Sequence, residues 1–103
     1  MASFNISISG DTMTIGFGAP AQNGTIVMDA EARLKELADK GELTGGPLLK
    51  ITGPASLPVA FVLAHAVCHL FETVAVFDPK LDKFVVSTSH GTAHKVGDLI
   101  DKQ

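Results

Sequence analysis

The stretch 48–77, LLKITGPASLPVAFVLAHAVCHLFETVAVF, decides the fold of this chain. Its first apolar segment, 48–51, predicts a short strand that a Gly-Pro pair ends. Ser56 is a helix-start residue, and a proline just inside the start predicts a helix over 58–70. The unbroken apolar run at 74–77 predicts a strand buried on both faces. A strand, a crossover helix and a second strand form a parallel pair with a right-handed connection.

Further elements flank this unit. Apolar and polar residues alternate over 4–8 and again over 13–17, and Gly10-Asp11 between them is typical of a hairpin turn. Asp29 reads as the cap of a helix closing at Gly41. Two more strands are predicted on the carboxyl side, at 84–87 and 96–100. The predicted fold is α/β, with a mixed sheet, an N-terminal antiparallel hairpin, a β-α-β crossover and two helices packed on the sheet.

Composition predicts a single domain spanning 1–103. Cys68 is the lone cysteine, which excludes an internal disulfide and favours a reducing compartment. The amino terminus does not resemble a signal peptide, and the longest apolar stretch, about 15 residues, is too short to span a bilayer. We therefore expect a cytoplasmic protein without a membrane partner. Apolar residues make up 46% of the chain and charged ones 18%, which suggests that another subunit covers part of the surface.

The formal net charge of −3 argues against a duplex DNA ligand. All four histidines lie in the last forty or so residues, so protonation would make the second half of the chain positive. The chain has no Trp or Tyr and no arginine cluster to stack single-stranded bases. A local anion site in the second half stays open.

The turn Gly53-Pro54-Ala55-Ser56 joins a strand to a helix start, where backbone N–H groups can hold a phosphate. It lacks a Gly-rich phosphate motif, so the residues alone favour an ordinary capped turn. His65 and His69 stand four apart and are expected to share one helix face. A functional pair and two hydrogen-bonded core histidines are equally favoured. The spacing can also hold a metal, but it lacks the glutamate of the HExxH pattern, so a closed zinc site is the weaker alternative.

Asp78-Pro79-Lys80 follows the predicted buried strand. As structure, this sequence makes a type I turn. As function, it places a carboxylate and an ammonium at the ligand-binding edge of an α/β sheet. His90 follows the polar residues that end the next predicted strand, whereas His94 and Lys95 are interpreted as solvated loop residues. Cys68 neighbours His69 in sequence but is expected to point elsewhere, so a Cys–His nucleophile pair is not predicted.

Several short motifs recur in order along the second half. They are ITGPASLPVAFVLAHAVCHLF at 51–71, TVAVFDPKLDKFVVSTSH at 73–90 and HKVGDLI at 94–100. This half resembles a family of small CRISPR-associated proteins from type III systems, the ring nucleases. They degrade the cyclic tetra-adenylate second messenger, alone or fused to an ATPase-like domain, and are distantly related to nucleotide-sensing CRISPR effector domains. The first half resembles the family mainly in its order of elements.

The resemblance implies an enzyme, a phosphodiesterase that linearises cyclic tetra-adenylate. It ties activity to four residues: His69, Asp78, Lys80 and His90. Lys80 stands where the family commonly has arginine, and lysine loses bidentate phosphate binding. Substrate binding is assigned to Gly53, Pro54, Ala55, Ser56 and Lys83. No cofactor is expected to be obligatory, but manganese has been associated with the family, and His65, His69 and His90 are its candidate ligands.

RNA cleavage by a ribose 2′-hydroxyl needs a base, an acid and charge stabilisation, which histidines, Lys80 and Asp78 can supply. A metal route with histidine ligands is a second mechanism. Two further functions stay open: a non-catalytic cyclic-oligoadenylate sensor and a manganese-dependent RNA deadenylase.

His69 precedes a strand that Asp78 follows, so the two residues are expected at opposite poles, with His90 near His69 and Lys80 and Lys83 near Asp78. One subunit then holds an incomplete site. We expect a homodimer that stacks head-to-tail on the ring into a tetramer or filament.

Overall fold

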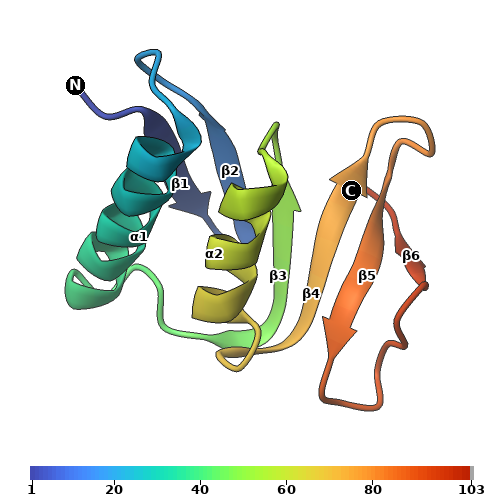
Figure 1. Ribbon diagram of the computed structural model, residues 1–103. Helices are drawn as coiled ribbons and strands as arrows, with labels where there is room; N and C mark the ends of the chain where they lie inside the picture. Colours follow the sequence, from blue (N-terminus) through green and yellow to red (C-terminus); the bar gives the residue numbers. More distant parts are fainter. Residues whose placement is uncertain (103) are drawn as a thin grey trace.

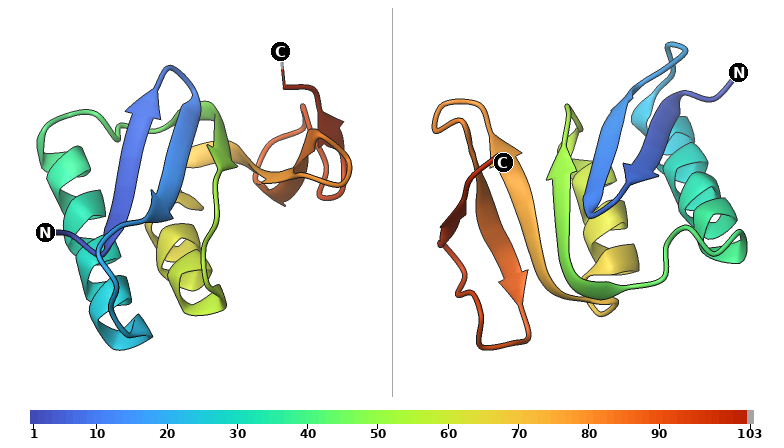
Figure 2. Two further views of the ribbon diagram at one scale, coloured as in Figure 1. Left: turned by 90° about the horizontal axis from the view of Figure 1, so that it is seen from above. Right: turned by 180° about the vertical axis from the view of Figure 1, so that it is seen from behind.

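A computed structural model describes residues 1–102 as one six-stranded mixed sheet with two helices on one face (Figures 1 and 2). The strands lie side by side in chain order. The pairs β1–β2, β4–β5 and β5–β6 are antiparallel, whereas β2–β3 and β3–β4 are parallel. This architecture confirms the predicted fold class. The elements are β1 Phe4–Ser9, β2 Thr12–Phe17, α1 Asn23–Asp39, β3 Gly46–Thr52, α2 Leu57–Val67, β4 Phe71–Asp78, β5 Lys83–Ser89 and β6 Leu99–Ile100.

The N-terminal hairpin forms as its alternation predicts. Ser9 pairs with Thr12 across a two-residue turn, in which Gly10 adopts a φ of 60°. A left-handed backbone of this kind suits glycine because it lacks a Cβ. The buried side chains of the hairpin, among them Phe4, Ile6, Met13 and Ile15, face the helices.

The predicted start of the first helix at Asp29 is wrong. Helix α1 begins six residues earlier, at Asn23, after Gln22, whose side chain makes no capping bond. The Asp29 carboxylate instead accepts hydrogen bonds from the Ser3 hydroxyl (2.6 Å) and the Ser3 N–H (2.9 Å). Both hydrogen bonds lower the pKa of Asp29 below its usual value, and the one from the Ser3 hydroxyl has the larger effect. Asp29 therefore ties the chain start to α1 rather than capping the helix.

The central crossover is confirmed, and its two strands pair in parallel, with Leu49 opposite Val74. Ser56 caps α2, as predicted, by accepting a hydrogen bond from the Val59 N–H. The helix ends at Val67, three residues before the predicted end, because the Leu70 N–H turns back to the Val67 carbonyl (3.0 Å). This tight turn leads directly into β4.

Strand β4 is less buried than its apolar run predicts. Thr73, Val74 and Ala75 are buried, but Val76 keeps 41% of its surface exposed. Val74 packs in the apolar cluster that contains the helices, whereas Val76 does not. A β-bulge between Val74 and Ala75 also shifts the register with β5. The helix-facing side of β4 is therefore covered only near its start, which corrects the expected burial on both faces.

Two apolar clusters stabilise the domain. The larger lies between the helices and β1–β4. The smaller lies on β4 and β5, where Ala75, Phe84 and Val86 are packed with Phe77 and Ile100. Burial of each large aliphatic or aromatic side chain contributes about 1.5–3 kcal/mol. Among the described residues, no helix is long and apolar enough to cross a membrane.

Candidate functional site

Two histidines meet at the end of the sheet where β4 begins. His69 lies in the turn between α2 and β4, and His90 directly follows β5. Antiparallel pairing of β4 with β5 brings them together, since the His90 N–H donates to the Glu72 carbonyl at 2.7 Å. Their rings stack with centroids 5.1 Å apart and planes 27° apart. The structure therefore brings together two residues that are 21 positions apart in the sequence.

The hydrogen bond of the His90 ring determines which of its two nitrogens carries a hydrogen. His90 Nε2 lies 2.7 Å from the Cys68 carbonyl oxygen. A carbonyl oxygen only accepts, so Nε2 carries a hydrogen, and Nδ1 of a neutral ring is left as an acceptor. The ring of His69 is exposed and makes no hydrogen bond within the described part of the chain.

Glu72 lies beside this pair, and the sequence reasoning missed it. A side chain at Gly91 would collide with the Glu72 carboxylate, so this carboxylate lies against the backbone that follows His90. No motif marks Glu72. Its position next to the histidines depends on the β4–β5 register, which the sequence alone does not define.

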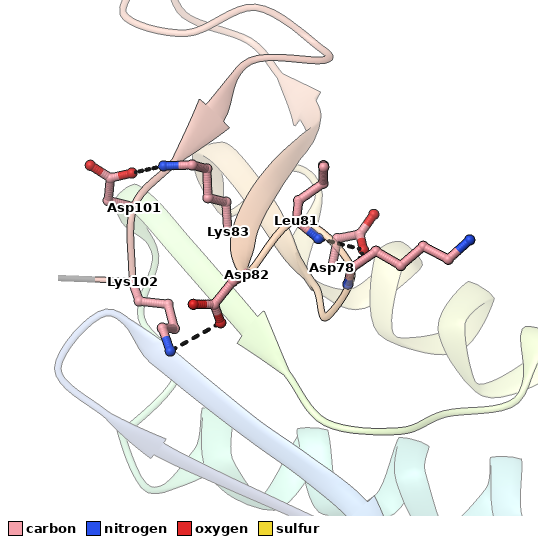
Figure 3. A network of polar contacts seen from close by, with 7 residues as sticks. Asp78, Leu81, Asp82, Lys83, Asp101 and Lys102 are labelled. Carbon is pink, nitrogen blue, oxygen red and sulfur yellow. Dashed lines mark hydrogen bonds and ion pairs between the residues drawn. The ribbon is translucent and has the colours of Figure 1, made fainter.

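The opposite end of β4 holds the Asp78 turn (Figure 3). One oxygen of Asp78, Oδ1, accepts hydrogen bonds from the N–H groups of Lys80 (2.8 Å) and Leu81 (3.4 Å). Asp82 completes the turn with a φ of 55°, and its N–H donates to the Asp78 carbonyl. The structure thus confirms a chain turn at Asp78, which the backbone bond from Asp82 closes. Its second oxygen, Oδ2, has no hydrogen-bond partner among residues 1–102.

The lysines around this turn differ in their pairing. Lys83 forms an ion pair with Asp101, and the hydrogen bond from Lys83 holds the pKa of that carboxyl below its usual value. Lys102 pairs with Asp82 at 3.0 Å (Figure 3). Lys80 is exposed, and its ammonium has no ion-pair partner among residues 1–102. Of the two lysines assigned from sequence, Lys80 is the one whose ammonium is unpaired within residues 1–102, whereas Lys83 would have to leave Asp101 to bind an anion.

The Gly53–Ser56 turn lies at the same end of the sheet as Asp78, because β3 and β4 run parallel (Figure 1). Gly53 has a φ of 125°, and a Cβ here would collide with the Ile15 carbonyl oxygen, so only glycine fits. The Ser56 hydroxyl donates to Asn23 Oδ1 at 2.9 Å, which ties the starts of both helices together. The N–H groups of Ala55 and Ser56 find no acceptor within the described residues.

The His69 end and the Asp78 end do not form one site within a subunit. Strand β4 spans eight residues, and at about 3.3 Å per residue it separates the two ends by more than 20 Å. Figure 1 shows β4 running from the α2–β4 turn at one edge to the Asp78–Lys83 turn at the other. The expected placement is confirmed: His90 lies with His69, and Lys80 and Lys83 lie with Asp78.

His65 is separate from the other histidines. It remains in α2, exposed, and lines a hollow between α1 and α2, whereas His69 lies beyond the helix end. The expected shared helix face is therefore wrong, because the helix stops at Val67. No three His, Cys, Asp or Glu side chains within residues 1–102 are placed to hold a metal ion.

A comparison with protein-family models gave a match that covers this set of residues. The model of a CRISPR-associated protein family, Cas_csx3, matches residues 32–101. The chain belongs to this family. The Csx3 match extends from within α1 through β6 and so includes both ends of the candidate site. The comparisons with curated proteins and with solved structures gave no match.

Proposed function

We propose that this Csx3 protein is a ring nuclease, a phosphodiesterase that linearises cyclic tetra-adenylate and so ends type III CRISPR signalling. The stacked pair of His69 and His90 carries the proposal. It places two exposed imidazoles side by side, and imidazoles can act as the general base and the general acid of RNA cleavage near neutral pH. Membership of a CRISPR-associated family supports this choice of substrate.

The proposed reaction uses the ribose 2′-hydroxyl as the nucleophile. One imidazole accepts the 2′-hydroxyl proton while the 2′-oxygen bonds to the adjacent phosphorus. The bond from phosphorus to the 5′-oxygen breaks, and a protonated imidazole gives that oxygen its proton. The products are a 2′,3′-cyclic phosphate and a 5′-hydroxyl, and atoms and charges balance without a metal. His69, with its free ring, is the residue that reaches the substrate, and His90 is held beside it by the Cys68 carbonyl.

The other end of the domain supplies the phosphate contacts. Lys80 offers an ammonium that is unpaired within residues 1–102, and Ala55 and Ser56 supply N–H groups just before the first turn of α2. Because more than 20 Å of β4 lies between the ends, a phosphate at the Asp78 end reaches histidines only from another molecule. The proposed assembly is a homodimer whose Asp78 end holds the ring while the His69 end of a second dimer closes over it.

Incubation with cyclic tetra-adenylate tests the activity. Purified protein is expected to convert it to linear products ending in a 2′,3′-cyclic phosphate, both with a chelator and with added manganese. Chromatography with mass detection identifies the products. An uncleaved, stable complex would instead identify a sensor. Cleavage of linear adenylate-tailed RNA that requires manganese, with the ring left intact, would identify a deadenylase.

Ligand binding at the Gly53–Ser56 turn can be mapped separately. Adding the cyclic nucleotide to ¹⁵N-labelled Asp78→Ala or His69→Ala protein is expected to shift the amide signals of Ala55 and Ser56, because their N–H groups are free to donate. The amide of Gly91, at the other pole, serves as a reference in a dilute sample. If the ligand binds while both turn amides keep their shifts, the turn has no part in binding.

A further inference from the structure

Glu72 lies directly opposite His90 across the β4–β5 pair. Thr73 pairs with Ser89, and the His90 N–H donates to the Glu72 carbonyl at 2.7 Å, so the antiparallel register continues by one residue. Residues that oppose each other in antiparallel strands point to the same face, with Cβ atoms about 5 Å apart. The Glu72 carboxylate and the His90 ring therefore share one face at this end of the sheet.

Gly91 provides the room for this carboxylate. An ideal Cβ at Gly91 would lie 2.5 Å from Cδ and 2.6 Å from Oε1 of Glu72, which is closer than a Cβ can approach. The backbone gives no other reason for glycine here, because Gly91 is not among the residues with a positive φ. The Ser89 hydroxyl donates to the Gly91 carbonyl at 3.4 Å and holds this turn in place. Glycine at this position thus serves the placement of an exposed carboxylate.

The Glu72 carboxylate forms no ion pair within residues 1–102. On the same face, the His90 ring uses one nitrogen, since Nε2 donates to the Cys68 carbonyl. Nδ1 of the neutral ring is an acceptor like the carboxylate, so no hydrogen bond can join the two in this state. A protonated ring carries a hydrogen on Nδ1 as well, and Glu72 is the acceptor placed beside it.

We propose that Glu72 is a positioning residue of the histidine pair, whose carboxylate accepts the Nδ1–H hydrogen bond of protonated His90. This inference rests on the proposed function, because it makes His90 the protonated imidazole of the cleavage reaction. Cys68 and Glu72 then hold the two ring nitrogens and fix the ring in its stack against His69. A carboxylate that orients a histidine and stabilises its imidazolium form serves the same purpose in serine proteases.

The proton balance of the step is simple. When the bond from phosphorus to the 5′-oxygen breaks, the Nδ1 proton of His90 passes to that oxygen. The ring becomes neutral, with its Nε2–H still bonded to the Cys68 carbonyl. Glu72 neither gains nor loses a proton, so it acts only through His90.

Nuclear magnetic resonance tests the hydrogen bond without any nucleotide. In ¹⁵N-labelled protein, at a pH where the His90 ring is protonated, its Nδ1–H should give an observable signal, because a bonded hydrogen exchanges slowly with water. His90→Ala assigns this signal. Gly91→Ala should remove it, since the added methyl group displaces the carboxylate. Glu72→Gln should weaken it, since a neutral amide oxygen is a poorer acceptor than a carboxylate.

Single-turnover cleavage of cyclic tetra-adenylate tests the role in the reaction. Glu72→Gln and Gly91→Ala are each expected to slow it about 10-fold or more, the scale of one hydrogen bond to a charged group. Equilibrium binding of the ring should not change. The double variant should be no slower than Gly91→Ala alone, because both changes remove the same contact. Glu42→Gln is the matched control, since Glu42 is also exposed but lies between α1 and β3.

Circular dichroism checks that every variant is folded. Absence of the Nδ1–H signal from wild type, or an unchanged signal in Gly91→Ala, overturns the contact between Glu72 and His90. A Glu72→Gln protein that cleaves as fast as Glu42→Gln overturns the positioning role, and so do losses that add up in the double variant. If the signal depends on Glu72 as described but wild type leaves cyclic tetra-adenylate intact, the contact stands and the proposed nuclease is wrong.

Discussion

Replacement of His69 by alanine is expected to slow single-turnover cleavage of cyclic tetra-adenylate by roughly 10²-fold or more. The His69 ring is exposed, makes no hydrogen bond among residues 1–102 and stacks on His90 at 5.1 Å. No packed contact of the core depends on it, so the loss should fall on the chemical step. Equilibrium binding of the ring should change little, because the proposed phosphate contacts lie at the other end of the subunit.

His65→Ala is the informative comparison, since it removes the same side chain four residues earlier. His65 lines the hollow between the helices rather than the His69 end, so its loss is expected to leave the rate within a few-fold of wild type. Rapid quench with excess enzyme separates cleavage from binding. An unaltered rate for His69→Ala would remove this residue from the mechanism, and an equal loss in both variants would point to a shared requirement for the helix.

The sequence was sufficient for the fold where a local pattern and the tertiary structure agree. The hairpin follows from alternation and Gly10-Asp11, and the crossover follows from an apolar helix between two short strands. The start of α1 was missed because Asn23-Gly24 is typical of a turn, whereas Asp29 is a good cap. That preference was overridden by Ser3, which is 26 positions away and engages the Asp29 carboxylate.

The two ends of the site were predictable because strand length alone separates them. Residues before and after an eight-residue strand must lie far apart, whatever the packing. His69 and His90 were expected to lie at the same end of the domain, but contact between their rings was not predicted. The contact between these two rings depends on where α2 ends and on the path of β5 beside β4. The alternative, a shared helix face for His65 and His69, assumed a helix that continues past Val67. Glu72 and Asn23 had no local signal, since each comes close through register or through the packing of helix starts.

A mixture of two inactive variants is expected to recover activity. His69→Ala lacks the reacting imidazole but keeps the Asp78 turn, and Asp78→Ala keeps the histidine pair but loses the carboxylate that accepts the Lys80 and Leu81 N–H groups. If one dimer supplies Asp78 and another supplies His69, a mixed stack contains complete sites. Random mixing should restore about one quarter of the sites, because each site needs the right subunit on both sides of a heterologous contact.

The assay compares the mixture with each variant alone at the same total protein concentration. A wild-type dilution series provides the second readout, since a site shared between dimers makes the specific rate rise with enzyme concentration, whereas a site within one dimer leaves it constant. Asp78→Asn, which keeps an acceptor oxygen for the turn, separates the carboxylate's charge from its structural role. If the mixture stays at the level of its components while both variants are folded and bind the ring, then His69 and Asp78 do not act on the same phosphate, and the stacked assembly is wrong. Recovery would instead explain why a strand holds the two functional ends of a small domain more than 20 Å apart: each end serves the substrate of a different neighbour.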